Sequence, residues 1–448
     1  MSSPSPLVIL ALVSSAMLSC KERNPAYCDG HPDDIDCRGD SGIGTPACTS
    51  NTQCTHPTPV CDMTRTMCVQ CTAAQSSACS DASPVCGAED ACRGCAADAE
   101  CASMTCLPDG SCAVPGSVLY AAPAPAGGVT ANCTPTAMCT VARAVELVDG
   151  TRSTIRLDAG RYDVIGSLAL GTSMRLVGRD AVIDRDAGGT GATLIVADGA
   201  TLALDYLTVE GGDGDTTGFG IGCTAATVIG REIGVAGNAA AGINSVGCSV
   251  ILDRARIAMN QGPGLAASGG SLVMTRSLVM ANQGGGLVVT AVPFDLQNNV
   301  IVKNGNPTSA FGGVLISQII TRGTHVFDFN TVAQNQATEG STPGVICSVV
   351  TTPLTFGNDI VFGNTSGTQV EGGNCAWTYS DIGPVPVVGT GNLTSDPQFI
   401  APAQNNFHLQ GTSPLRDVAD PAATLGQDID DDTRPQGSGR DVGADEIK

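Results

Sequence analysis

The segments NAAAGINSV (238–246), NQGPGLAAS (260–268) and NQGGGLVVT (282–290) begin at intervals of 22 residues. An asparagine, a glycine and an aliphatic residue keep the same phase in all three segments, and Asn304 continues it. Short strand-like runs lie between them: ARIAM (255–259), SLVMA (277–281) and NVIVK (299–303). A period near 22 with several short strands is typical of a parallel β-helix, in which each repeat forms one coil. The sequence therefore predicts stacked aliphatic columns and asparagines that hydrogen-bond from coil to coil.

Other architectures fit this period less well. Leucine-rich repeats have a similar length, but their L-x-x-L-x-L frame is absent, and a two-sheet sandwich would not keep three residue types in phase. The phase breaks after Asn304, since the next asparagine-ended strands are FDFNTVAQN (327–335) and IVFGN (360–364). We expect loops inserted at 307–311 and 338–343, on the side of the solenoid where binding faces usually form.

Composition and charge exclude several classes of protein. The 448-residue chain has 56 Gly, 21 Cys, 3% aromatic and 15% charged residues, which is too few charges for a helix bundle or coiled coil. Apolar residues make up 42% of the chain, enough for a core of aliphatic side chains. The net charge of −21 excludes nucleic acid as a partner, because binding phosphates requires the opposite sign. Polyanionic polysaccharides would also be repelled unless metal ions bridge them.

The first twenty residues, MSSPSPLVILALVSSAMLSC, predict export. Residues 7–18 form an apolar run that is too short to span a bilayer and is typical of a signal peptide. Residues 17–20 (MLSC) resemble the lipobox of bacterial lipoproteins, although no Lys or Arg precedes the run and Met17 stands where Leu is usual. The resemblance implies acylation of Cys20 and a lipid anchor in the bacterial outer membrane or cell surface. The alternative is a free secreted protein.

The other twenty cysteines are an even number, as a disulfide framework outside the cytoplasm requires. TPVCDMTRTMCVQC (58–71) is repeated as SPVCGAEDACRGC (83–95), within three quartets of cysteines between 48 and 112. Repeats this small have almost no apolar core, so we expect two disulfides in each, worth about 2–4 kcal/mol apiece. The C-x-x-C pairs 68/71 and 92/95 leave a zinc site as the alternative. Cys28 and Cys37 are expected to form the remaining pair. We expect the cysteine repeats between 48 and 112 to act as a spacer or a binding module.

Six cysteines lie further along the chain. Cys223 and Cys248 are 25 residues apart and Cys347 and Cys375 are 28 apart, which is about one coil in each case. Stacked positions in neighbouring coils lie near the Cα separation that a disulfide prefers. The predicted disulfides are Cys133–Cys139, Cys223–Cys248 and Cys347–Cys375.

A single helix is expected ahead of the strands. Residues 140–149 (TVARAVELVD) place Val141, Ala144 and Val145 on one face, with Thr140 as N-cap and Gly150 just past the end. The preceding stretch 115–128 (PGSVLYAAPAPAGG) is predicted to be a linker.

Two parts of the chain resemble known families. Residues 139–164 and 173–186 resemble the start of exported bacterial right-handed β-helix proteins with the pectin-lyase-like fold. Residues 395–420 and 428–446 resemble the end of the choice-of-anchor Q domain, with Asp431 where that family tends to have Gly. The resemblance spans about 129–448 and implies a fold and an attachment to the cell surface, but no reaction.

These observations predict an all-β chain, a single-stranded right-handed parallel β-helix with a short N-terminal capping helix and a disulfide-rich stalk. The expected parts are a lipoprotein signal peptide (1–19), a flexible tether (20–47), cysteine-rich disulfide repeats (48–114), a linker (115–128), the β-helix (129–395) and a C-terminal cap (396–448).

The acids and histidines of the chain are its candidates for a catalytic site. Polygalacturonase-like hydrolases use paired carboxylates, marked by Asp-Asp on one coil and Gly-His-Gly on the next, and this chain has no Gly-His-Gly. Calcium-dependent lyases need clustered acids and a basic residue, for which Glu210, Asp213 and Asp215 with Arg231 are the candidates. His325 and Asp328 could form a general-base pair, but strand alternation places them on opposite faces.

The sequence therefore favours a non-enzymatic lipoprotein that presents its β-helix for binding or structural roles. Its expected partners are the membrane, through the lipid, and a polysaccharide or another surface protein. The alternative is a polysaccharide lyase or glycoside hydrolase, which would require acids from adjacent coils to converge on one exposed face.

The tail is expected to cover the last coil with Phe399, Phe407, Leu409 and Leu415. Asp428, Asp430 and Asp432 alternate in a way that suggests calcium, but Thr433 and Gly439 stand where an EF-hand-like loop needs Gly and Glu. The favoured alternative is that Arg434 or Arg440 pairs with these aspartates, and no cofactor is otherwise expected.

Overall fold

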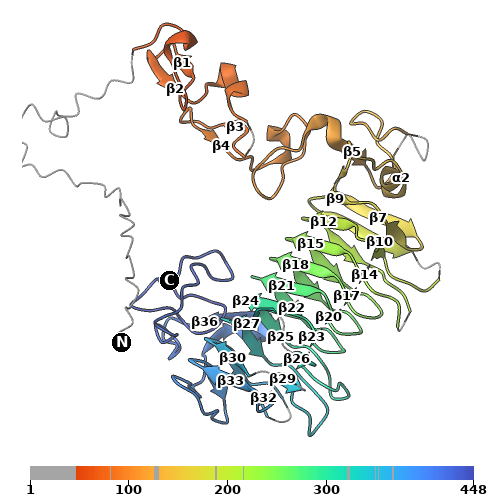
Figure 1. Ribbon diagram of the computed structural model, residues 1–448, viewed down its shortest axis with the longest axis vertical. Coiled ribbons are helices and arrows are strands. Elements are labelled where there is room, and N and C mark those ends of the chain that lie inside the picture. The colour runs from red at the N-terminus through yellow and green to blue at the C-terminus, as the bar shows by residue number, and fades with distance from the viewer. Residues whose placement is uncertain are drawn as a thin grey trace, which may run out of the picture. The chain divides into compact units, whose positions relative to one another are not determined.

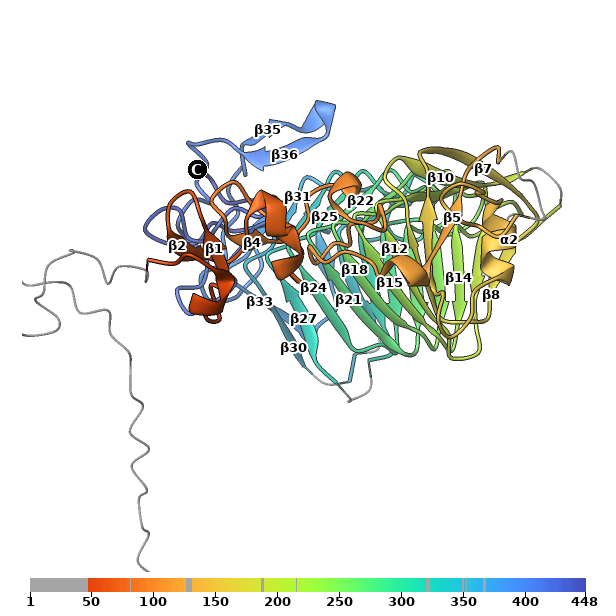
Figure 2. The ribbon, with the colours of Figure 1, turned by 90° about the horizontal axis from the view of Figure 1, so that it is seen from above.

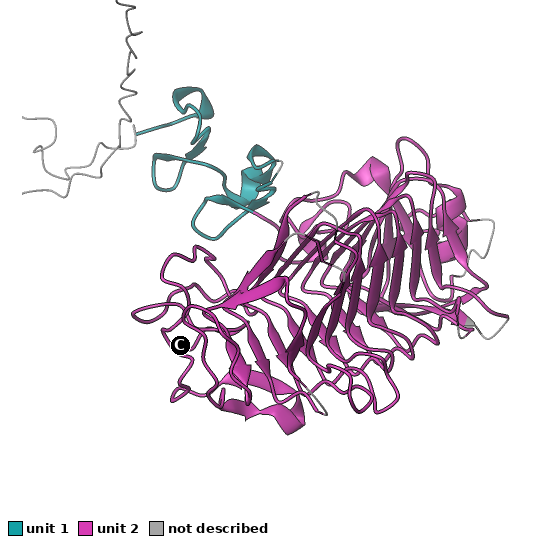
Figure 3. Cartoon of the chain, turned by 60° about the horizontal axis from the view of Figure 1, so that its bottom comes forward, with its two compact units in different colours: residues 1–93 teal, residues 94–448 magenta. Residues whose placement is uncertain are grey.

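The computed structural model describes residues 47–448 apart from 81, 126–130, 187–188, 215, 320–322, 349, 352 and 366–367. The predicted signal peptide, Cys20 and the Cys28–Cys37 pair lie outside the described residues. The chain divides into two compact units, residues 1–93 and 94–448, coloured separately in Figure 3. Within the described residues, no helix is long and apolar enough to cross a membrane.

Disulfides hold the described part of the first unit together. In both of its repeats the first cysteine binds the third and the second binds the fourth: Cys48–Cys61, Cys54–Cys68, Cys71–Cys86 and Cys79–Cys92. Each repeat carries one antiparallel hairpin, β1 (Val60–Asp62) with β2 (Met67–Val69) and β3 (Val85–Cys86) with β4 (Cys92–Arg93). The alternative hypothesis of a zinc site is wrong for these cysteines, because a cysteine in a disulfide has no thiolate to bind the metal.

The third cysteine repeat belongs to the second unit. It repeats the same pairing with Cys95–Cys106 and Cys101–Cys112. Its chain docks on the start of the β-helix, where the Tyr120 hydroxyl donates to the Ser103 carbonyl at 2.8 Å. Residues 115–128 are not simply a linker: Val118–Ala121 form strand β5, because this short apolar run pairs with Thr154–Leu157 (β6) and is buried.

The second unit is a right-handed parallel β-helix, whose coils contribute strands to three parallel sheets (Figure 1). Sheet A contains β5 and β6, then β9 (Met174–Val177), β12 (Thr201–Asp205), β15 (Thr227–Arg231), β18 (Ser249–Asp253), β21 (Ser271–Thr275), β24 (Phe294–Gln297), β27 (His325–Asp328), β30 (Leu354–Gly357) and β33 (Cys375–Thr378).

Sheet B contains β7 (Gly160–Ile165), β10 (Ala181–Asp186), β13 (Thr208–Glu210), β16 (Gly234–Ala236), β19 (Arg256–Ala258), β22 (Leu278–Met280), β25 (Val300–Val302), β28 (Thr331–Ala333), β31 (Ile360–Phe362) and β34 (Asp381–Gly383). Sheet C contains β8 (Leu168–Leu170), β11 (Leu194–Val196), β14 (Ile221–Thr224), β17 (Ile243–Val246), β20 (Leu265–Ser268), β23 (Leu287–Thr290), β26 (Val314–Ser317), β29 (Val345–Ser348) and β32 (Val370–Glu371).

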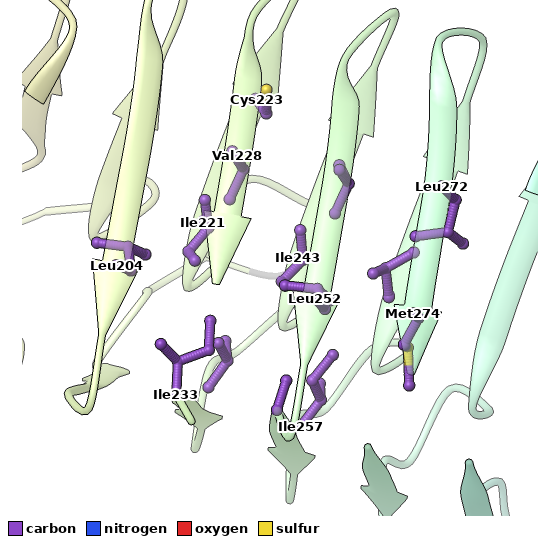
Figure 4. Packing of buried hydrophobic residues seen from close by; sticks show 14 of the residues in the cluster. Leu204, Ile221, Cys223, Val228, Ile233, Ile243, Leu252, Ile257, Leu272 and Met274 are labelled. Atoms are coloured by element: carbon purple, nitrogen blue, oxygen red, sulfur yellow. The ribbon is translucent and has the colours of Figure 1, made fainter. Parts of the chain in front are cut away.

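The 22-residue phase is the register of these sheets. Ile243 pairs with Leu265 and Leu265 with Leu287, so residues of one phase stack in one column. The inward side chains fill a continuous aliphatic core, of which Figure 4 shows Leu204, Ile257 and Met274 among others. The predicted fold and its core columns are thus confirmed.

Asparagine ladders run through the turns, as predicted. After sheet B, each asparagine amide donates to the asparagine of the next coil, from Asn238 to Asn260 at 2.8 Å and onward to Asn282 at 2.8 Å. A second ladder, which the sequence did not reveal, lies between sheets A and B, where Asn299 donates to Asn330 at 3.0 Å. The backbone before each ladder residue is left-handed, with φ of 55° at Asn298, and turns the chain sharply into the next strand.

The N-terminal end of the solenoid is covered by helix α2 (Val141–Glu146). The Thr140 hydroxyl accepts from the Arg143 amide at 3.2 Å and so caps the helix as predicted. Val141 and Ala144 are buried in the core of the first coils. The helix ends before 149, because the Asp149 carboxylate folds back to accept from the Thr151 and Arg152 amides.

The tail does not cover the last coil, which corrects the expected end cap. Residues 384–395 do so, with Val387 packed against the core and Leu393 bridged to Asp381. The tail, residues 396–448 with hairpin β35 (Phe399–Ala401) and β36 (Asn406–Leu409), instead lies along the outer face of sheet B (Figure 2). Outward apolar side chains explain this position: Phe407 packs on Met280 and Val302.

Short 3-10 turns complete the described structure. They are Asn51–Gln53, Ala73–Ala78, Asp98–Glu100, Pro115–Ser117 and Pro402–Gln404.

Candidate functional site

The outer face of sheet C is almost free of charge. Its strands turn every second residue outward, and these residues are Ala169, Ile195, Gly222, Thr224, Asn244, Val246, Ala266, Ser268, Val288, Thr290, Leu315, Ser317, Ile346, Ser348 and Glu371. Glu371 is the one ionisable residue among them, and its carboxylate accepts from the Thr342 hydroxyl at 2.7 Å. The described strands of this face therefore offer no pair of carboxylates for acid–base chemistry.

Acids from adjacent coils do converge on the outer face of sheet B. Asp184 lies in register with Asp163 on one side and with Glu210 on the other. The guanidinium of Arg161 binds Asp184 and Glu210, and its Nε lies 3.3 Å from Asp163. One exposed arginine thus neutralises part of a three-carboxylate ladder. This cluster could not be predicted from the sequence, because it lies upstream of the regular 22-residue phase.

The calcium group predicted at Glu210, Asp213 and Asp215 is not assembled as expected. Glu210 is paired with Arg161, the backbone of Asp213 pairs with Gly191, and Asp215 lies outside the described residues. Arg231 is not beside Glu210 but on sheet A, where its Nη1 lies 3.9 Å from Asp205. Burial raises the pKa of Asp205 to about 6, although the nearby arginines oppose the shift.

His325 and Asp328 do not form a general-base pair. The His325 ring packs edge-on against the core residue Phe294 at a centroid distance of 5.2 Å, and burial lowers its pKa. Asp328 faces outward and accepts from the Asn358 amide at 2.8 Å. Burial raises the pKa of Asp328 to about 6. Both residues line an open cleft of about 270 Å³, and Asp420 of the tail also lines it.

The aspartate loop of the tail is organised by its own backbone. The buried Asp428 carboxylate accepts from the amides of Asp430 and Asp432 at 2.8 Å each and of Glu446 at 3.0 Å. Burial raises the pKa of Asp428. Carboxylate oxygens of Asp428, Asp430 and Asp432 lie within 4.8 Å of one another, so calcium at this loop stays a prediction.

The expected pairing of Arg434 or Arg440 with these aspartates is wrong. Arg434 is buried and donates to the carbonyls of Asp441 and Gly443, and Arg440 donates to the carbonyl of Leu425. These carbonyls lie close by in the folded tail and take the guanidinium donors instead.

Other cations hold the aspartate loop. Lys448 pairs with Asp432 at 2.9 Å. Asp431 binds Arg254 and Arg276, which project from successive coils. The loop is therefore tied both to the chain end and to the β-helix.

A third cluster lies where the tail meets sheet B. His408 Nδ1 lies 2.8 Å from Asp445 and 3.4 Å from Asp430. The hydrogen bond to Asp445 raises the pKa of His408, which burial opposes. These residues line a cleft of about 200 Å³ together with Leu278, Val300 and Phe407. This cluster could not be predicted from the sequence, since its members are far apart in the chain.

Disulfides join the solenoid cysteines in the pairs that the coil spacing predicts. Cys223–Cys248 and Cys347–Cys375 each have a Cα separation of 6.3 Å, and Cys133–Cys139 has one of 4.9 Å. The first two pairs link neighbouring coils between sheets C and A, so they fasten the wall of the solenoid.

Comparison with known proteins agrees with this fold. Among solved structures, pectate lyase Pel9A superimposes with a TM-score of 0.53 at 15% identity, over 74% of this chain and 96% of the lyase. The A-module of the Azotobacter vinelandii mannuronan C-5 epimerase AlgE4 matches with a TM-score of 0.34 at 15% identity, over 55% of this chain and 91% of the module. The likeness to the lyase shows a shared fold. No family model and no curated protein matches the sequence, so the choice-of-anchor Q resemblance stays a prediction.

Proposed function

We propose that the chain is a bacterial cell-surface or periplasmic lipoprotein whose β-helix binds a polysaccharide or a surface protein without cleaving it. The lipid anchor at Cys20 is part of this proposal and rests on the sequence of residues 17–20. The nine disulfides of the described residues support an oxidising location outside the cytoplasm.

The outer face of sheet C, with Glu371 as its one ionisable outward residue on the described strands, carries this proposal. It is a long parallel surface of aliphatic, hydroxyl and amide side chains, as a surface for extended neutral ligands needs, and it lacks the groups that would cleave them. Val288 and Leu315 lie side by side on this face, in register on β23 and β26. A ligand that follows the solenoid axis would meet such pairs repeatedly.

Binding can be tested by retention on insoluble polysaccharides and on cell envelopes. We expect Leu315→Glu to reduce retention several-fold, because a buried carboxylate at the interface would be desolvated without a partner. Val273→Glu is the matched control, since Val273 faces outward on sheet A. Equal retention of both variants would show that sheet C is not the binding face. For the anchor, Cys20→Ser should move the protein from the detergent phase to the soluble fraction.

A lyase is the second candidate, and the cluster of Arg161 with Asp163, Asp184 and Glu210 favours it. Stacked carboxylates can hold calcium, and the charged Arg161 guanidinium beside them could pair with an acidic sugar, which are binding parts of a calcium-dependent lyase. We expect no unsaturated product from pectate, alginate or polygalacturonate with calcium, measured by ultraviolet absorbance. A product that disappears in Glu210→Gln would replace the binding proposal with this one.

A further inference from the structure

Three side chains from separate parts of the tail meet at one point. His408 is on β36, Asp430 is in the aspartate loop and Asp445 precedes the chain end. One ligand atom of each, a ring nitrogen and two carboxylate oxygens, lies within 4.8 Å of the other two. The His408 Nδ1 distances of 2.8 Å to Asp445 and 3.4 Å to Asp430 place the nitrogen between the two carboxylates.

Contacts outside the cluster hold Asp445 and the backbone of Asp430 in place. The other oxygen of Asp445 accepts from the Leu409 amide at 2.6 Å, which fixes the carboxylate against β36. The amide of Ala444 donates to the Thr331 hydroxyl at 3.1 Å, which fixes the same segment to sheet B. The amide of Asp430 donates to the buried Asp428 carboxylate at 2.8 Å. A ligand would therefore find the Asp445 carboxylate already positioned and the Asp430 backbone held beside it.

The cluster is also accessible. The Asp445 side chain is 13% exposed, whereas His408 is 40% and Asp430 is 52% exposed. The cleft of about 200 Å³ opens beside them and is walled on the other side by Leu278, Val300 and Phe407. An ion could enter from this side and keep a coordination position open toward the cleft.

We propose that His408, Asp430 and Asp445 form a binding site for a divalent transition metal of the zinc class. Imidazole nitrogens and carboxylate oxygens both bind zinc, and three protein ligands with an open fourth position are the arrangement of open, four-coordinate zinc sites. A nitrogen donor selects against calcium and magnesium, which prefer oxygen ligands. The ion needs a deprotonated Nδ1, so binding displaces any proton from this nitrogen.

The site would fasten β36 to the aspartate loop and the chain end, and so fix the tail on sheet B. It is distinct from the calcium predicted at Asp428, Asp430 and Asp432, because it does not use Asp428, whose oxygens already accept from three backbone amides. The two sites share Asp430, so His408 and Asp432 distinguish them.

The test is titration of the full chain with zinc by calorimetry and with cobalt by visible absorption. We expect one site, a cobalt spectrum of low coordination number, and a rise in melting temperature with zinc. His408→Gln and Asp430→Asn should each weaken zinc binding by at least about tenfold. Asp432→Asn, the matched control in the same loop, should bind zinc as the unmodified chain does.

Melting curves without metal show whether each variant folds. If His408→Gln does not fold, Asp430→Asn still tests the site, because Asp430 is half-exposed and its replacement should leave the fold intact. The proposal is overturned if the unmodified chain binds no zinc. It is equally overturned if His408→Gln binds like the unmodified chain, or if binding is lost in Asp432→Asn but kept in His408→Gln, which would place the ion in the aspartate loop.

Discussion

Asp431 binds Arg276 across 155 positions of sequence and joins the tail to the middle of the β-helix. The same carboxylate binds Arg254, one coil earlier. The backbone of Asp431 is left-handed, with φ of 70°, a conformation that glycine adopts without strain. The two arginines hold the Asp431 side chain while its backbone stays in this conformation.

Replacing Asp431 by asparagine should weaken this attachment. Asparagine tolerates the left-handed backbone but cannot pair with two guanidinium groups, so we expect a loss of about 1 kcal/mol in the free energy of unfolding at low salt. High salt should shrink the loss, because it screens partly exposed charges. Denaturant titrations at low and at high salt measure the loss in the free energy of unfolding. Glu339→Gln, at an exposed position, is the control. A loss that does not depend on salt would contradict the ion-pair explanation.

Phe407→Ala should detach the hairpin from sheet B. The ring is 5% exposed, packs on Met280 and Val302, and meets Phe399 edge-on at 5.2 Å. We expect a loss of about 3 kcal/mol, whereas the exposed Ile400→Ala should change stability little. Deleting 396–448 should cause aggregation, since outward apolar side chains of sheet B become exposed. A truncated chain that stays monomeric and melts like the full one would show that the tail is an appendage.

Asn282→Ala should open the ladder at its middle. The buried amide accepts from Asn260 and donates to Asn304 at 2.9 Å and to the carbonyl of Ile257 at 3.0 Å. Its loss leaves buried partners unsatisfied, at a cost of about 2–3 kcal/mol. Asn244→Ala, on the outer face of sheet C, is the control. Hydrogen exchange should rise in the coils that flank Asn282, and unchanged exchange would mean that water replaces the amide.

Asp381 should make the protein less stable as pH rises. Burial raises its pKa to about 7, so the folded chain holds a proton that the unfolded chain loses near pH 4. Between these values the folded state binds more protons, and stability therefore falls with pH. Asp381→Asn keeps an acceptor for the Ser395 amide and should stabilise the protein at pH 8 but not at pH 4. Parallel melting curves of the two proteins against pH would contradict this assignment.

The regular part of the β-helix could be predicted from the sequence, because the coil length is constant there. Asn238, Asn260 and Asn282 each advance by one coil, so sequence phase equals sheet register. The same reasoning placed Cys223 opposite Cys248. Upstream, Asp163, Asp184 and Glu210 stack although their spacings are uneven, and the phase could not show that they meet.

The position of the tail on sheet B was not predicted, for a different reason. The apolar residues at 396–415 fit an open coil end equally well, because a solenoid needs its last coil covered. The missed signal was in the strands themselves: Val279 faces the core while Met280 faces outward, and both are apolar. Consecutive apolar residues in a strand indicate burial on both faces, and hence a second layer over sheet B.

The tail fixes the number of coils along part of the solenoid, because it is attached to several of them. The attachment points are Arg254, Arg276, Asn298, Thr331 and Asn358. Duplicating or losing a coil in this interval would shift every later attachment point by one step along the axis. Coils before Arg254 carry no such constraint from the described tail contacts. We therefore expect evolutionary change in solenoid length to fall between residues 200 and 250, where a whole 22-residue unit can be gained without disturbing the tail.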